Sequence, residues 1–192
     1  MSDRVNLGCV EDENLKDSLE RLLHFAANEG HLSVCELIMK NITAMNPSDE
    51  DGQTPLHFVA YKGHLDIYKL LILNTNDKNP KNNKGFTPLH IAVENNHIPL
   101  CKFILNEVKD ANPGNNQWIT PLHRAALFGH LGIFDLILNK ISEIEPRDKL
   151  GWTPLHLASK SGLLKMYQTI LKSRILFKMI IWLPKILCVS SD

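Results

Sequence analysis

The sequence predicts an all-α fold built from repeated helical units that stack on one another. The first observation is the tetrapeptide Thr-Pro-Leu-His, which recurs every 33 residues, starting at Thr54, Thr87, Thr120 and Thr153. The second is a partial upstream copy of this tetrapeptide in the same register, Leu23-His24. The third is a Gly-His pair that follows the first histidine of a unit, starting at Gly30, Gly63 and Gly129. A fixed period of this length is typical of a repeat array.

Each unit is predicted to contain two helices. Threonine followed by proline is a helix start, because the hydroxyl caps the helix and proline fits the first helical position. Two small residues follow, such as Val59 and Ala60, and let neighbouring first helices approach closely. Gly or Asn then ends the helix. A second helix follows, with apolar residues at helical spacing, as at Leu65, Tyr68 and Leu71.

An extended segment and a turn are predicted to join consecutive units. The Asn-Pro pairs that start at Asn46, Asn79 and Asn112 hold the backbone extended. A glycine before each of three tetrapeptides suits a turn with positive φ: Gly52, Gly85 and Gly151. Because no unit can bury its apolar face alone, the units must stack, and each end of the stack needs a polar cap.

These motifs resemble the ankyrin repeat, whose signature is a 33-residue period containing Thr-Pro-Leu-His-x-Ala. The resemblance covers roughly residues 16–172. It implies an ankyrin-repeat solenoid of stacked helix–turn–helix units with β-turn fingers. It also implies a protein-interaction module that is not an enzyme and needs no cofactor.

The register divides the chain into three parts. Residues 1–15 form an acidic segment that fits a polar cap. Five repeats follow, at 16–48, 49–81, 82–114, 115–147 and a truncated 148–172. The apolar, basic tail 173–192 leaves the register, and three explanations stay open: a truncated or alternatively ended longer array, an improvised cap, or a segment that contacts a partner or membrane. Its stretch 182–187 faintly resembles the end of a SOCS box, but the upstream part of that box is missing.

Composition excludes several classes of protein. Lys and Arg number 21, as do Asp and Glu, so the formal net charge is zero and favours no nucleic-acid partner. The N-terminus lacks the apolar core of a secretory signal, and four cysteines without close pairing indicate a reducing compartment. We therefore expect a cytoplasmic or nuclear protein. Membrane contact is not expected, and the chain is expected to be monomeric unless the tail associates.

The histidines and cysteines are predicted to be structural. All nine histidines fall on the repeat grid, without a set of ligands at metal-binding spacing. The resemblance implies that the tetrapeptide histidines bond to the capping threonine and the others to backbone between repeats. Cys35 and Cys101 share a core-facing helix position. We find no catalytic constellation and expect no bound metal.

The resemblance also implies one modification. The Asn before each proline can be hydroxylated in ankyrin proteins by an asparaginyl hydroxylase. Asp77 and Asp110 lie two residues before Asn79 and Asn112, which matches the acidic preference of such sites. Hydroxylation of Asn79 and Asn112 is therefore a prediction, beside their role in stabilising the turn.

Positions outside the repeat framework predict the partner site. In the resembling family, partners bind the concave surface of fingertips and first helices. The apolar and aromatic residues at such positions are Phe86, Trp118, Ile119, Leu127, Phe128 and Trp152. Trp118 stands where three other units have glycine. One alternative is sequestration of a transcription factor, as by the inhibitor of NF-kappa-B. Another is a fragment or regulatory part of a larger ankyrin-containing enzyme, channel or ubiquitin-ligase adaptor.

Overall fold

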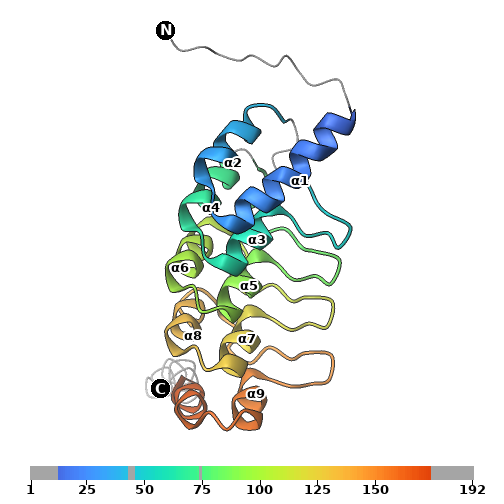
Figure 1. Cartoon of the computed structure of the whole chain (residues 1–192). Helices are drawn as coiled ribbons and strands as arrows, with labels where there is room; N and C mark the ends of the chain where they lie inside the picture. Colours follow the sequence, from blue (N-terminus) through green and yellow to red (C-terminus); the bar gives the residue numbers. More distant parts are fainter. Residues whose placement is uncertain (1–12, 43–45, 74, 174–192) are drawn as a thin grey trace, which may run out of the picture. The chain divides into compact units, whose positions relative to one another are not determined.

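The computed structural model describes residues 13–42, 46–73 and 75–173, and these form helices and connecting segments without a strand. The chain divides into two compact units, Met1–Lys109 and Asp110–Asp192. Each unit consists of paired helices linked by long loops (Figure 1). The all-α prediction is confirmed. The predicted tail, apart from Ser173, lies outside the described residues.

The first unit contains three helix pairs. They are α1 (Glu13–Glu29) with α2 (Leu32–Met39), α3 (Pro55–Lys62) with α4 (Leu65–Ile72), and α5 (Pro88–Glu94) with α6 (Ile98–Glu107). The first helices α1, α3 and α5 pack in a row, and α2 packs on α4. The small residues at the contacts between first helices are buried, as Val59 and Ala60 show.

The second unit repeats this arrangement. It contains α7 (Pro121–Phe128), α8 (Leu131–Leu138), α9 (Pro154–Lys160) and a further helical stretch over residues 164–173. Helix α7 packs on both α8 and α9. The core combines the small residues of first helices with larger side chains of second helices, including Ala125, Ile133 and Phe134.

The four tetrapeptides start four helices as predicted. In α3, the Nδ1 atom of His57 lies 3.0 Å from both the backbone nitrogen and the Oγ1 of Thr54. The same pairing occurs at Thr87, Thr120 and Thr153 with the histidine three residues later. Threonine and histidine therefore satisfy the free backbone groups of the first turn reciprocally.

Helix α1 differs from the other first helices in length. It has 17 residues where α3, α5, α7 and α9 have seven or eight. Its start at Glu13 lies before the expected boundary between residues 15 and 16. Leu22 occupies the register position of Pro55, so no proline removes a backbone N–H or forces residue 21 to be extended. The helix consequently continues upstream through an acidic segment.

Candidate functional site

The finger of the fourth repeat is a closed turn that presents Trp118. The Asn115 side chain accepts hydrogen bonds from the backbone nitrogens of Gln117 and Ile119, both at 2.9 Å. The Trp118 nitrogen donates to the Asn115 carbonyl at 2.9 Å. These bonds hold Trp118 at φ 59°, near the 72–78° of Gly52, Gly85 and Gly151. The predicted left-handed turn is therefore present, with a tryptophan in it.

Trp118 keeps most of its surface in solvent. Its exposed fraction is 60%, and that of Phe128 at the end of α7 is 42%. Ile119, Leu127 and Trp152 are half-buried. The second unit therefore carries five of the six predicted partner residues, and two of them, Trp118 and Phe128, are exposed aromatics.

Trp152 shows how a finger and a first helix share a face. The Lys160 Nζ atom, at the end of α9, lies 4.8 Å from the centre of the Trp152 ring. Ile119 and Leu127 occupy the same two positions one repeat earlier, 33 residues upstream in each case. Repeat symmetry thus places Ile119 and Leu127 on the equivalent face of their own repeat.

Phe86 belongs to the first unit and is described separately. Its half-buried ring makes an edge contact with His90, with ring centres 5.5 Å apart. Its carbonyl accepts a hydrogen bond from His57 Nε2 at 3.1 Å. That the six predicted residues form one continuous surface stays a prediction.

Two grooves of the first unit lie apart from the six predicted partner residues. A groove of about 390 Å³ runs along the first helices, lined by Asn28, Gln53, His57, Phe58, Tyr61, Ile91, Glu94 and Asn95. Its mixed apolar and amide lining is a second candidate surface for a peptide. Tyr61, at the end of α3, is exposed and has the Lys62 Nζ atom 5.7 Å from its ring centre. The sequence signal for this groove was two residue pairs outside the repeat framework that end their first helices, Tyr61-Lys62 and Glu94-Asn95.

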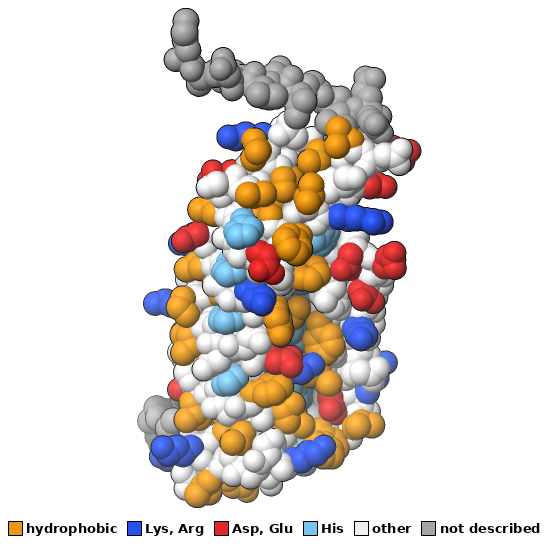
Figure 2. All heavy atoms as spheres, in the orientation of Figure 1, with side chains coloured by type: hydrophobic (Ala, Val, Ile, Leu, Met, Phe, Trp, Pro, Cys, Tyr) orange, Lys and Arg blue, Asp and Glu red, His pale blue; other side chains and the backbone are white. Residues whose placement is uncertain are grey.

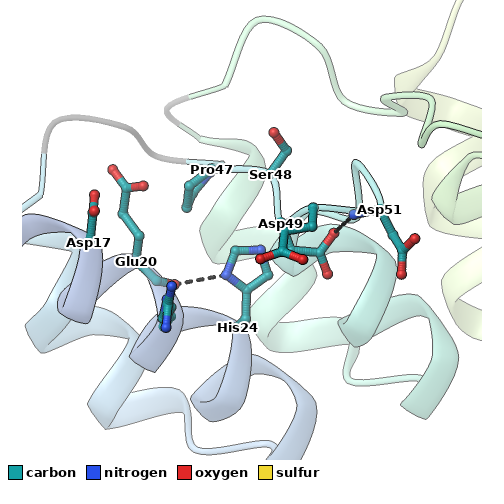
Figure 3. A pocket seen from close by; sticks show the side chains of 9 residues that line it. Asp17, Glu20, His24, Pro47, Ser48, Asp49 and Asp51 are labelled. Carbon is teal, nitrogen blue, oxygen red and sulfur yellow. Dashed lines mark hydrogen bonds between the residues drawn. The ribbon is translucent and has the colours of Figure 1, made fainter.

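The larger groove, of about 550 Å³, lies between α1 and the first finger (Figure 3). It is lined by Asp17, Glu20, Arg21, His24, Pro47, Ser48, Asp49, Glu50 and Asp51. Several of its polar side chains make hydrogen bonds that stabilise the fold. Asp49 accepts from the nitrogens of Asp51 and Gln53, and His24 bonds to the carbonyls of Glu20 and Gln53. The sequence signal was the cluster of acids in the first finger, which becomes a groove only because α1 extends over it.

The histidines of the four tetrapeptides bond to their capping threonines as expected. Because the Phe86 carbonyl can only accept, His57 Nε2 carries the proton and Nδ1 accepts from Thr54. His123 bonds Thr120 and the Trp152 carbonyl in the same way. Burial lowers the pKa of both rings, more than the acceptor carbonyls raise it. The histidines at the start of the second helices act differently: His64 and His97 bond to backbone carbonyls of the preceding repeat.

The described cysteines lack nucleophilic character. Cys35 and Cys101 are free and fully buried. Burial raises the thiol pKa of Cys35 to about 11 and that of Cys101 to about 12. Both side chains are therefore protonated near neutral pH and fill space in the core. Cys9 and Cys188 lie outside the described residues.

Metal and membrane features were searched in the same part of the chain. Residues 13–42, 46–73 and 75–173 contain no group of three His, Cys, Asp or Glu side chains that could hold a metal ion. None of the helices they form combines the length and hydrophobicity needed to cross a bilayer.

The finger asparagines are fixed by hydrogen bonds. Asn79 Oδ1 accepts from the Leu89 nitrogen and Asn112 Oδ1 from the Leu122 nitrogen, both at 2.9 Å. The backbone nitrogen of each asparagine in turn donates to the carboxylate of the aspartate two residues upstream. The predicted turn-stabilising role of Asn79 and Asn112 is confirmed.

Paired short helices, capping histidines and fingers at a 33-residue period together define a repeat protein of the ankyrin type. A family model described as ankyrin repeats (3 copies) matches residues 23–117 and 95–178. The chain belongs to the ankyrin-repeat family, and its repeats indicate a protein–protein interaction module. No curated protein matches the chain significantly.

Proposed function

We propose that the chain binds a protein partner through an aromatic surface of its second unit, formed by Trp118, Ile119, Leu127, Phe128 and Trp152. Phe86 is proposed as a further contact on the first unit. The observation that carries the proposal is Trp118, a largely exposed tryptophan at φ 59°. A left-handed conformation costs a residue other than glycine about 1–2 kcal/mol. A ring with 60% exposure returns only part of that cost through burial.

The chemistry around Trp118 fits an interface anchor. Tryptophan is enriched at interface hot spots, where an apolar ring becomes buried against the partner. In the neighbouring repeat, Lys160 lies over Trp152 and adds a cation beside an aromatic ring. Phe128 stacks on His130, with ring centres 6.0 Å apart. Both contacts restrain large side chains before binding, which lowers the entropy lost on association.

The identity of the partner would distinguish between the more specific functions that the sequence leaves open. Sequestration of a transcription factor, as by the inhibitor of NF-kappa-B, requires a DNA-binding protein on this surface. A role within a larger enzyme, channel or ubiquitin-ligase adaptor requires a subunit of that assembly. Neither is favoured by a particular contact in the structure. The cytoplasmic or nuclear location and the non-catalytic role belong to the same proposal.

Comparative affinity capture tests the proposed surface. The bait is the full chain, beside a triple variant carrying Trp118→Ala, Phe128→Ala and Trp152→Ala. Leu73→Ala is the matched control, because Leu73 is an exposed apolar residue of the first unit, at the end of a second helix. Circular dichroism checks that all three baits are folded.

We expect the wild-type and Leu73→Ala baits to retain proteins that the triple variant loses, and mass spectrometry to identify them. If the folded triple variant retains the same proteins as wild type, the aromatic surface is not the binding site. The groove lined by Tyr61, Glu94 and Asn95 would then be tested next.

We also propose hydroxylation of Asn79 and Asn112. Their side-chain oxygens hold the following helix start, so the modification requires each finger to be released from its hydrogen bond. Peptide mass spectrometry of the protein from its native cells would show a gain of one oxygen on each asparagine. Unmodified peptides from cells with an active hydroxylase would refute this part of the proposal.

A further inference from the structure

The smaller groove of the first unit combines aromatic, amide and acidic side chains. It has a volume of about 390 Å³ and is lined from α1, the first finger, α3 and the end of α5. Ligand pockets span about 300–1,000 Å³, so a groove of this size fits one or two side chains of a partner. Over α3 and α5, Figure 2 shows hydrophobic side chains beside acidic and basic ones.

The chemistry of this groove is not imposed by the repeat. Asn28, Tyr61 and Glu94 occupy one register position in three successive repeats, 33 residues apart. The next two repeats have Leu127 and Lys160 at that position. Because the repeat accommodates five different side chains there, the fold does not require an amide, a ring and a carboxylate in this groove. Recognition of a ligand would give them a role.

The charged side chain of the lining is Glu94, which is half-buried at the end of α5. His57 adds no competing positive charge near neutral pH, because burial lowers its pKa and its Nδ1 atom accepts from Thr54. Glu94 already takes part in an interaction within the fold, but a carboxylate has about four acceptor sites. The groove therefore favours a positively charged donor.

The amides of the lining favour a donor as well. The Asn95 Nδ2 atom donates to the Ile91 carbonyl at 2.9 Å, and the Asn28 Nδ2 atom donates to Glu29 at 2.7 Å. Each amide thus uses its nitrogen within the fold, and its side-chain oxygen is the acceptor that it can offer to a ligand.

Two rings give the groove an apolar wall. Phe58 is half-buried and makes an edge contact with His24, with ring centres 5.5 Å apart. Tyr61 is 56% exposed, and the Lys62 Nζ atom lies 5.7 Å from its ring centre, so a cation can approach this ring. A planar guanidinium stacks on an aromatic face and pairs with a carboxylate through two N–H groups, which an ammonium cannot do. The combination of ring and carboxylate therefore favours arginine over lysine.

We propose that this groove binds an arginine side chain from an extended segment of a protein partner. The guanidinium stacks on Tyr61 and donates to the Glu94 carboxylate and the Asn95 side-chain oxygen. The methylene stem packs against Phe58, and a backbone N–H further along the segment donates to Asn28. This site is separate from the aromatic surface proposed above, and neither depends on the other.

NMR titration of the isotope-labelled full chain with short peptides tests the site. The probe is acetyl-Leu-Ser-Arg-Ser-Leu-amide, which presents the arginine and both leucines on one side when it is extended. One control peptide carries citrulline, which keeps the shape of arginine without its charge, and another carries lysine. We expect the arginine peptide to shift the backbone signals of Tyr61, Glu94 and Asn95. It should bind about fivefold more tightly than the citrulline peptide.

Two substitutions separate the contacts of the guanidinium. Glu94→Gln should weaken binding of the arginine peptide about fivefold and leave the citrulline peptide unchanged, because it removes the charge and keeps the shape. Tyr61→Leu should weaken the arginine peptide about threefold by removing the ring. Glu36→Gln is the matched control, because Glu36 is an exposed acid on α2 outside the groove, and it should change neither affinity. Circular dichroism checks that the variants are folded.

Several results would overturn the proposal. Equal affinity for the arginine and citrulline peptides, or equal weakening of both by Glu94→Gln, would mean that the groove does not recognise the charge. Tighter binding of the lysine peptide would exclude a guanidinium site. Shifts centred on Asp49 and Asp51 would place the cation in the other groove, and an absence of shifts at millimolar peptide would leave no site. If Glu94→Gln does not fold, unchanged binding to Tyr61→Leu refutes the proposal.

Discussion

Replacing Trp118 by glycine separates binding from folding within a single side chain. The change removes an indole with 60% exposure and relaxes a backbone held at φ 59°. It leaves intact the hydrogen bonds that close the finger, because these use the Asn115 side chain and backbone atoms. The effect on the free energy of unfolding is then the sum of three opposed contributions.

Their magnitudes follow from the geometry. Relief of the left-handed conformation stabilises the variant by about 1–2 kcal/mol. The greater freedom of glycine in the unfolded chain destabilises it by about 0.5–1 kcal/mol. Loss of the covered fraction of the ring costs at most about 2 kcal/mol at about 25 cal/mol per Å². We therefore expect a net change between about 1.5 kcal/mol of stabilisation and about 2 kcal/mol of destabilisation, seen as a Tm shift of about 8 °C or less.

Trp118→Ala is the matched control, because it removes the same ring and keeps a Cβ at positive φ. We expect Trp118→Gly to be more stable than Trp118→Ala by about 1 kcal/mol in urea unfolding. Both variants should weaken partner binding by about 2 kcal/mol, or about thirtyfold in Kd, measured by calorimetry with the captured partner.

Two results would refute this reasoning. A loss of 3–5 kcal/mol in stability with glycine is the cost of removing a buried tryptophan, and would mean that the ring is packed in the fold. Binding that is unchanged in both variants would mean that the exposed ring is not an anchor.

Four further predictions follow from the described contacts. Because the pKa of His57 and His123 is lowered in the folded state, the unfolded chain takes up protons first as the pH falls below about 6.5. Stability should be fully present above that pH and fall on acidification by at most about 1.4 kcal/mol per pH unit for each histidine; a flat urea midpoint between pH 7.5 and 5.5 would contradict this. Cys35 and Cys101, with thiol pKa values of about 11 and 12, should resist thiol reagents at pH 8 until the protein unfolds, and rapid labelling of either native peptide would show an accessible thiolate. Asn79→Ala should cost about 1–2 kcal/mol by leaving the Leu89 nitrogen without its side-chain acceptor, and urea unfolding beside wild type measures this loss. Hydrogen exchange should be fastest from Leu163 onward, because the repeat register after Lys172 supplies no polar cap for this last helix, and uniform protection through Val189 would instead show that the tail is a cap.

The local chemistry of each repeat was determined by the sequence. A threonine before proline starts a helix, and the histidine three residues later completes the cap, because all the atoms involved lie within one turn. The glycine at each fingertip implied a left-handed turn, and Trp118 adopts it at φ 59°. The structural role of the histidines could also be predicted, because they recur at the same positions of each repeat and neighbouring repeats share one geometry.

The tertiary structure decided which apolar residues are buried. Val34 and Ile67 are equivalent in register and similar in chemistry, yet Val34 is 45% exposed and Ile67 2%. Burial depends on whether another layer lies against the residue, and a side chain's own identity does not contain that information. The groove between α1 and the first finger also depends on tertiary packing, because it forms where α1 extends to Glu13 over that finger. Its sequence signals were the acids of the first finger and Leu22 in place of proline, but only packing shows that the longer helix and the finger enclose one groove.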